Sequence, residues 1–188
     1  MFRTSFFISS FFVLLAGLGL SPSALAQDWR VDYGKSWIRF TSQQMGVAMP
    51  GDFQRFSVSA RFDPARPESG SYQVELDMAS ISTGTPDGDA EVQRPAWFDT
   101  ARHPRADFAS RTVRKTAQGY VAQGNLTVKG KTLPTSMAFT LRPMGKGWQA
   151  DGQYVIKRSD FGIGGGEWAD PSVVADPVRV EFRLVLMP

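Results

Sequence analysis

Apolar and polar residues alternate along several stretches of this chain. Within 55–62, arginines and serines separate four apolar side chains, namely Phe56, Val58, Ala60 and Phe62. The same alternation returns at 178–186. Successive side chains of a β-strand point to opposite faces, so each stretch predicts a strand with one apolar and one polar face. Several such strands in one short chain predict a sandwich or a closed barrel.

Eight segments predict strands, and closure of the sheet would remove its exposed edges. They are 29–40, 53–62, 72–78, 106–113, 120–128, 133–141, 148–156 and 178–186. The segment 43–51 predicts a loop. Thr85-Pro86-Asp87 predicts a helix start, with a capping hydroxyl followed by proline, and we expect the helix to run to about Arg94. The predicted fold class is all-β, an antiparallel and roughly eight-stranded barrel with one short helix.

The first 26 residues have the pattern of a cleavable secretory signal peptide. Arg3 supplies the only charge, 6–20 is apolar, and Ala24-Leu25-Ala26 resembles a cleavage site. The apolar run is short for a membrane span, and a retained N-terminal anchor is the alternative. We therefore expect residues 27–188 to form a single exported domain.

Composition excludes several kinds of chemistry. The chain has no cysteine, so it has neither disulfides nor thiolate chemistry. Its net charge is +3, and loss of Arg3 with the signal peptide lowers that charge by one. The basic residues are spread among acidic ones and form no stripe suited to nucleic acid. We expect no nucleic-acid partner.

Candidate catalytic and metal-binding residues are few. His103 is the only histidine and lies beside Pro104, and no G-x-S-x-G motif is present. One histidine without cysteine also argues against zinc, haem or iron–sulfur ligation. The acidic run 87–91 lacks the remaining positions of an EF-hand and suits the first turn of a helix. We expect no metal or cofactor.

A carboxylate pair leaves one enzymatic alternative open. Asp160 and Glu167 flank a glycine-rich stretch, and two carboxylates are the catalytic groups of most glycosidases. The sequence does not give their separation. A secreted hydrolase that uses these two residues is therefore kept as an alternative function.

A series of short motifs resembles the YceI-like family of exported lipid-binding barrels. In chain order these motifs are Gly51-Asp52-Phe53, Phe62-Asp63-Pro64, Ser80-Ile81-Ser82-Thr83, Trp97-Phe98-Asp99, His103-Pro104, Gly124-Asn125-Leu126-Thr127-Val128-Lys129-Gly130 and Arg158-Ser159-Asp160-Phe161-Gly162-Ile163. They cover essentially all of the predicted mature chain. The resemblance implies a lipocalin-like barrel with a lipophilic tunnel. It also implies binding of a long polyisoprenoid, such as a quinone tail or polyprenyl lipid, in the bacterial periplasm.

The chain departs from the family pattern in the predicted helix. Members often carry an Arg-Asp pair and a leucine there, whereas this chain has Glu-Val-Gln-Arg-Pro at 91–95. Trp97 also replaces a common phenylalanine. Both departures bear on the end of the tunnel and on the surroundings of a head group.

The predicted ligand contacts lie on the apolar faces of the strands. They are Phe40, Phe56, Val58, Phe62, Val74, Leu76, Leu126, Val128, Phe139, Phe182 and Leu184. Trp97, Phe98 and Phe161 are further predicted contacts, expected with Trp168 near an opening or beneath the helix. Arg158 and Asp160 are expected to pin a turn, with contact to a head group as the alternative.

Burial of an apolar tail can supply affinity without a catalytic residue. One buried methylene is worth about 0.8 kcal/mol, so roughly ten sequestered carbons offer about 8 kcal/mol before ordering costs. That value approaches micromolar affinity. Together with the ligand that the family resemblance implies, this predicts a non-enzymatic periplasmic carrier of an isoprenoid lipid or quinone, with transient membrane contact, as a monomer or homodimer. A fully packed barrel acting as an interaction or stress module is a further alternative.

Overall fold

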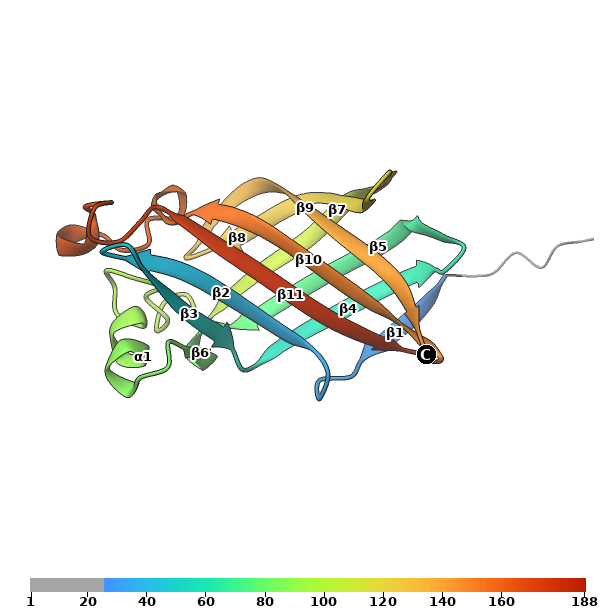
Figure 1. Cartoon of the computed structure of the whole chain (residues 1–188), viewed down its shortest axis with the longest axis horizontal. Helices are drawn as coiled ribbons and strands as arrows, with labels where there is room; N and C mark the ends of the chain where they lie inside the picture. The colour runs from blue at the N-terminus through green and yellow to red at the C-terminus, as the bar shows by residue number, and fades with distance from the viewer. Residues whose placement is uncertain (1–25) are drawn as a thin grey trace, which may run out of the picture.

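The chain is built mainly from antiparallel strands (Figure 1). The computed structural model describes residues 26–188, so the predicted signal peptide lies outside the described residues except for Ala26. The strands are β1 (Gln27–Val31), β2 (Trp37–Gln44), β3 (Val47–Phe53), β4 (Phe56–Asp63), β5 (Arg66–Asp77), β6 (Ile81–Ser82), β7 (Arg105–Thr116), β8 (Gly119–Val128), β9 (Lys131–Met144), β10 (Gly147–Lys157) and β11 (Pro177–Met187).

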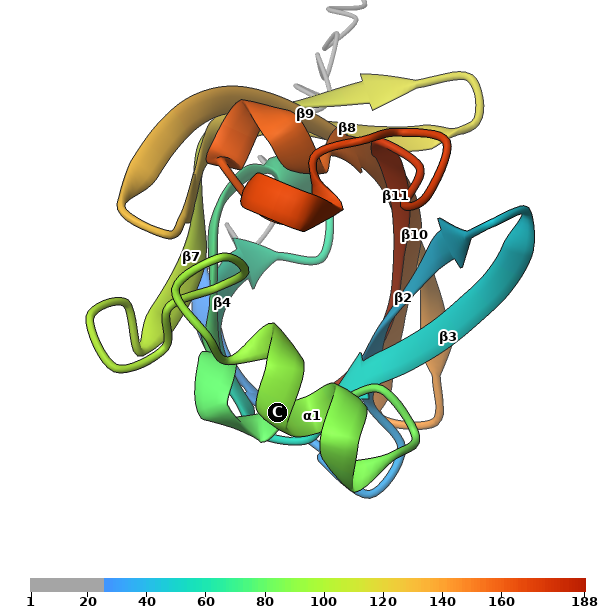
Figure 2. The ribbon, with the colours of Figure 1, turned by 90° about the vertical axis from the view of Figure 1, so that its left-hand side faces the viewer.

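Eight of these strands close into a barrel, seen end-on in Figure 2. The order is β1-β4-β5-β7-β8-β9-β10-β11, and β11 returns to β1 through the pairs Arg30↔Met187 and Val31↔Leu186. Further along β11, β2 takes the place of β1, and β3 and β6 extend the sheet from β2. The predicted eight-stranded antiparallel barrel is confirmed.

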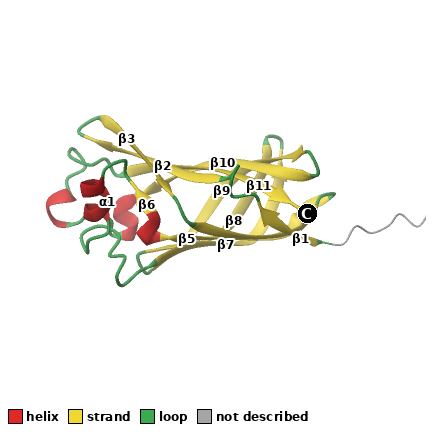
Figure 3. Cartoon of the chain, turned by 90° about the horizontal axis from the view of Figure 1, so that it is seen from below, coloured by secondary structure: helices red, strands yellow, loops and turns green. Residues whose placement is uncertain are grey.

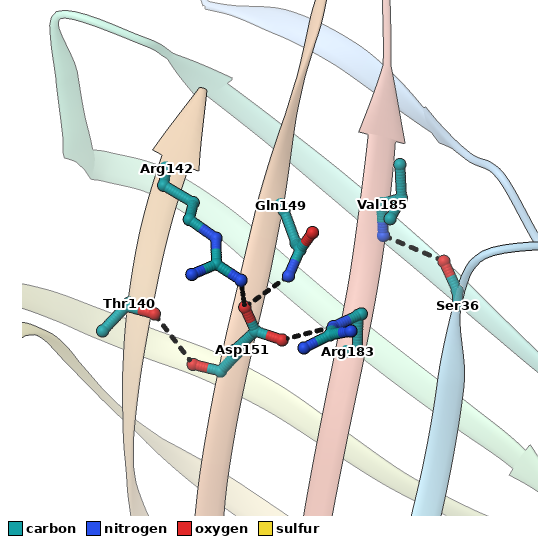
Figure 4. Close-up of polar contacts among 7 residues, drawn as sticks. All are labelled: Ser36, Thr140, Arg142, Gln149, Asp151, Arg183 and Val185. Atoms are coloured by element: carbon teal, nitrogen blue, oxygen red, sulfur yellow. Dashed lines mark hydrogen bonds and ion pairs between the residues drawn. The ribbon is translucent and has the colours of Figure 1, made fainter. Parts of the chain in front are cut away.

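The first predicted strand, 29–40, is wrong in one respect, because the structure divides it into β1 and β2. Between them residues 32–36 leave the ladder. The Asp32 amide still donates to the Val185 carbonyl at 2.8 Å, but the Val185 amide donates to the Ser36 hydroxyl at 2.9 Å (Figure 4). A side chain thus replaces a backbone acceptor at this interruption.

The predicted loop at 43–51 is also wrong, because this segment forms a β-hairpin. β2 and β3 pair from Gln44↔Val47 to Arg39↔Asp52. Met45 and Gly46 form the turn with φ angles of 50° and 79°. Positive φ at both central residues is the type I′ geometry, which asparagine-glycine usually signals. The chain has methionine at the first of these positions, so the usual hairpin signal was absent.

The predicted helix start is confirmed in α1 (Pro86–Val92). The Thr85 hydroxyl accepts a hydrogen bond from the Gly88 amide at 3.2 Å. The helix ends at Val92, two residues before the expected Arg94. Among residues 26–188, no helix combines the length and apolar character needed to cross a bilayer.

The helical elements gather at one end of the barrel (Figure 3). Besides α1, they include the 3₁₀ turns η1 (Met78–Ser80), η2 (Arg158–Phe161) and η3 (Gly166–Trp168). The C-terminus lies at the opposite end (Figure 1). The helical elements therefore distinguish one end of the barrel from the end that holds the C-terminus.

Stacked rings fill the barrel toward the C-terminal end. Phe62 has no exposed surface and stacks against Trp29 and Tyr72, with ring centroids 5.0 Å and 5.7 Å away. Tyr72 lies 5.9 Å from Phe139, which stacks on Tyr120 at 5.5 Å. We call these five residues the aromatic plug.

An ionic network ties three strands together on the outer face of the barrel (Figure 4). The Asp151 carboxylate of β10 accepts hydrogen bonds from Arg142 Nη2 of β9 at 2.9 Å and from Arg183 Nε of β11 at 2.7 Å. Gln149 Nε2 donates a third at 2.6 Å. Partial burial disfavours the charged carboxylate, but these donors outweigh it and hold the pKa of Asp151 below its ordinary value.

Candidate functional site: an apolar cavity along the barrel

The barrel encloses an apolar cavity of about 500 Å³. Every strand except β1 contributes to its wall, as do α1 and the loops around it. The lining follows β11 from Val178 to Leu186, which is about 26 Å of strand at roughly 3.3 Å per residue. Small-molecule sites commonly have volumes of about 300–1,000 Å³, so the cavity is large enough for a ligand.

Glycines opposite aromatic residues help to keep this cavity open. Phe40 pairs across the sheet with Gly51, and Phe182 pairs with Gly152. A Cβ atom at Gly51 would lie 2.2 Å from the Phe40 ring, and one at Gly152 would lie 2.3 Å from the Phe182 ring. Each ring therefore lies against the backbone of the neighbouring strand, where a side chain would push it toward the lumen.

The structure places eleven of the fourteen predicted contact residues on the cavity wall. They are Phe40, Val58, Val74, Leu76, Trp97, Phe98, Leu126, Val128, Phe139, Phe182 and Leu184. Contact of these residues with a ligand stays a prediction.

Three predicted contacts, Phe56, Phe62 and Phe161, do not line the cavity. Phe62 belongs to the aromatic plug, and Phe161 is buried in the core within η2. Phe56 packs edge-on against Tyr33 at 5.5 Å, beside the segment where β1 leaves the ladder. Alternation predicts which face of a strand a residue occupies, but it carries no information on depth along the barrel.

Sequence reasoning missed several lining residues. Ile38 and Val180 alternate with the predicted Phe40 and Phe182, so their signal was present in the sequence. Tyr154 also lines the wall, and burial raises its pKa above the ordinary value. Its hydroxyl can donate a hydrogen bond to a ligand from this mostly apolar wall.

Polar lining residues gather where the cavity approaches α1. We call this region the mouth and define it by Ser42, Gln44, Thr83, Thr85, Asp87 and Glu91. Ser42 and Gln44 come from β2, and the other four come from α1 and the loop before it. The cavity thus has an apolar body and a polar rim.

A segment pinned by Arg158 covers this end of the barrel. Residues 158–176, which we call the cover, join β10 to β11. Arg158 is buried, with 4% of its surface exposed. Its guanidinium donates hydrogen bonds of 2.7–3.2 Å to five carbonyls, those of Ile163, Gly164, Trp168, Val174 and Ala175. The prediction that Arg158 pins a turn is confirmed.

Further hydrogen bonds join the cover to the loop after α1. The amides of Gly164 and Gly165 both donate to the Ala96 carbonyl at 2.9 Å. Lys129 Nζ donates to the carbonyls of Pro95 and Gly162, at 2.9 Å and 2.7 Å. Desolvation lowers the pKa of Lys129, but its ammonium remains the donor that joins the two loops to the β8–β9 turn.

One buried donor in the cover has no partner. The Trp168 ring lies 5.6 Å from the Trp97 ring and lines the cavity. Trp168 Nε1 is buried, and no hydrogen-bond acceptor contacts it within residues 26–188. Such an unpaired donor costs about 1–3 kcal/mol, so the cover is held less favourably than its other hydrogen bonds suggest.

The two acids of the hydrolase alternative lie outside the cavity wall. Asp160 in η2 and Glu167 in η3 are both exposed. The Asp160 carbonyl accepts a hydrogen bond from Lys131 Nζ at 3.0 Å, so its backbone also anchors the cover. In the described part of the chain, no group of three or more acidic, histidine or cysteine side chains is placed to hold a metal ion.

Solved structures with the same fold include three bacterial proteins. BcnA of Burkholderia cenocepacia aligns with a TM-score of 0.80 at 38% identity, over 83% of this chain and 99% of BcnA. A YCEI protein of Campylobacter jejuni aligns with a TM-score of 0.65 at 19% identity, over 72% of this chain and 82% of that protein. A polyisoprenoid binding domain of Saccharophagus degradans aligns with a TM-score of 0.63 at 18% identity, over 87% of this chain and 98% of that domain. The last two show likeness of fold alone.

Sequence comparisons agree with the fold. UPF0312 proteins of Serratia proteamaculans and Photorhabdus laumondii are 31% and 30% identical over 152 residues. The alignments cover 75% of this chain and 78–79% of those proteins. The model of the YceI-like domain matches residues 29–186, nearly the whole described barrel. The chain belongs to the YceI-like family.

Proposed function

We propose that this protein binds the apolar chain of a polyisoprenoid lipid, a quinone tail or a polyprenyl lipid, in the barrel interior. It acts as a periplasmic carrier or reservoir. The observation that carries the proposal is the apolar cavity that follows β11 for about 26 Å and ends at a polar mouth. The signal-peptide pattern at 1–26 supports the periplasmic location, and the Saccharophagus polyisoprenoid binding domain supports the class of ligand.

The chemistry of the wall suits a long hydrocarbon tail. The wall is mostly aliphatic and aromatic, and each methylene transferred to such surroundings contributes about 0.8 kcal/mol. A tail in the barrel body leaves a polar head group at the mouth, near Thr85 and Gln44. Affinity therefore comes from burial of the tail, and the polar residues of the mouth contact the head group.

Binding without catalysis fits the positions of the candidate acids. Asp160 and Glu167 are exposed and off the cavity wall, so a ligand held in the barrel would not meet their side chains there. In this proposal the protein therefore releases its ligand chemically unchanged.

A bulky residue on the wall tests the proposal. Val58→Phe adds a ring to the lining and should reduce uptake of a polyisoprenoid quinone at least about tenfold, at a stability cost of about 1–3 kcal/mol. Uptake is measured as quinone that co-elutes with the mature protein on gel filtration, and folding is checked by denaturant titration.

The matched control is Val155→Phe. Val155 is 62% exposed on β10 and does not line the cavity, so the same added ring should leave uptake unchanged. Full uptake by a folded Val58→Phe protein would place the ligand elsewhere and refute the proposed site.

A further inference from the structure

The tip of the β2–β3 hairpin exposes apolar side chains beside the mouth. Met45, Val47 and Met49 are 76%, 62% and 39% exposed. They account for three of the six large apolar side chains that are exposed within residues 26–188. We call these three residues the tip. Exposed apolar side chains that gather at one place are candidates for contact with another apolar surface.

Charge is absent from the tip and its flanks. Although 21% of the chain is charged, the nine residues 43–51 include no Asp, Glu, Lys or Arg. The hairpin projects from the wall of the barrel, and it lies at the same end as α1 (Figures 2 and 3). An uncharged apolar element is complementary to the uncharged acyl region of a bilayer rather than to its charged head groups.

Met45 is not a residue that the geometry of this turn favours. Met45 has a φ of 50°, a conformation that costs a side chain such as methionine about 1 kcal/mol and that asparagine adopts more readily. The same residue is the most exposed of the six large apolar side chains. Both properties are unfavourable for the isolated protein, so contact with an apolar partner would account for methionine at this position.

The tip is continuous with the cavity. Met49 lines the cavity and is also partly exposed, and Pro50 beside it lines the cavity as well. The hairpin is held in place at the rim, because the Met45 amide donates to the Val173 carbonyl at 2.8 Å and the Ala175 amide donates to the Gln43 carbonyl at 2.9 Å. An apolar path therefore joins the barrel interior to the exposed end of the hairpin.

We propose that the tip inserts into the surface of a lipid bilayer and brings the mouth against it, so that lipid passes between membrane and cavity without crossing water. The proposal rests on the proposed function for its purpose, but insertion can be tested separately. Insertion is shallow, about 5–10 Å, because the described pairings leave the outer edge of β3 unpaired from Val47 to Gly51. Unpaired backbone groups are not tolerated in the hydrocarbon core.

The test compares two double variants of the mature protein in flotation with phosphatidylcholine vesicles. Met45→Asn with Val47→Thr removes two tip residues that do not line the cavity, and both replacements suit a hairpin. The control, Met144→Gln with Val155→Thr, removes apolar side chains that are 37% and 62% exposed but lie outside the β2–β3 hairpin. Wild type and control should float with the vesicles. The tip variant should partition on the order of tenfold less, and salt should have little effect.

Four results would overturn the proposal. In the first, wild type fails to float, and in the second, the control loses as much binding as the tip variant. In the third, binding requires anionic phosphatidylglycerol. In the fourth, wild type does not bind vesicles but forms a dimer that the tip substitutions abolish. The last result would make a second copy of the chain the occupant of the tip.

Uptake of detergent-dispersed quinone separates this proposal from the proposed function. The tip variant should take up as much quinone as wild type at equilibrium but should transfer it between vesicles more slowly. Wild type that floats without taking up quinone would refute the carrier role alone. Uptake without flotation would refute insertion of the tip alone.

Discussion

Rings close one end of this barrel, whereas loops and carbonyl hydrogen bonds cover the other. The aromatic plug is built from side chains on the strands, and at its centre Phe62 has no exposed surface. The cover is a loop segment between β10 and β11 that is held by hydrogen bonds, five of them from one buried guanidinium, that of Arg158. The plug is therefore part of the strand framework itself, but the cover is attached to that framework.

This difference separates stability from ligand exchange. The cover lies outside the strand ladders, and loop segments of this kind commonly open at lower free energy than the strands of a core do. The cover also contains an unpaired buried donor, Trp168 Nε1. We therefore expect the cover and mouth to open for a lipid while the plug stays closed.

The largest expected effect comes from opening the plug. Phe62→Ala removes a fully buried ring that stacks on two others and should lower the free energy of unfolding by about 3–5 kcal/mol. Denaturant titration measures this loss. The rate of quinone release from the protein that remains folded should change little. If Phe62→Ala accelerated release as much as a cover variant does, the plug and the cover would not have separate roles in stability and exchange.

A smaller loss of stability, with a larger effect on exchange, is expected from the cover. Arg158→Met removes the donor to five carbonyls and should cost roughly 3 kcal/mol. Hydrogen exchange should rise in residues 158–176 before it rises in the strands, and quinone release should be faster. Protection that is lost equally in the plug strands would show that both ends open as one unit.

The smallest effect is expected between the ends, at Asp151. Because its pKa is lowered in the folded protein, its ionisation stabilises the fold above the unfolded pKa of about 4 and ceases to do so as pH falls through the folded value. Asp151→Asn should therefore cost roughly 1 kcal/mol at pH 7, and the difference from wild type should disappear once the pH falls below the lowered pKa of the folded protein. If the stability difference between Asp151→Asn and wild type persisted at low pH, it would come from packing and not from ionisation. If Asp151→Asn changed the rate of quinone release, the outer ionic network would have an unexpected role in exchange.

Much of the barrel follows from alternation in the sequence, because a strand with one apolar face has to bury it. β8 and β11 were predicted to within one residue at each end. The division of the first strand at 32–36 and the hairpin at 43–51 were missed. Both depend on local choices, a hydroxyl that replaces a backbone acceptor and a methionine in a left-handed turn, which periodicity does not reveal.

The cavity wall was predictable by face but not by depth. Val58 and Phe62 share an apolar stripe of β4, yet the first lines the cavity and the second fills the plug. The glycines opposite Phe40 and Phe182 show why the aromatic residues do not simply fill the barrel, but this reading needs the strand register. The family resemblance supplied the expectation of a hollow barrel, which alternation alone left open.

Native mass spectrometry of the protein purified from its own cells, beside Val58→Phe purified in the same way, is the most direct test of the lipid-binding cavity. We predict a bound species of isoprenoid mass on the wild type, identified after organic extraction, and little of it on Val58→Phe. An unliganded mass for the wild type that does not change after incubation with polyprenyl lipids and quinones would contradict the account. The same ligand at full occupancy on both proteins would contradict the assignment of the cavity as its site.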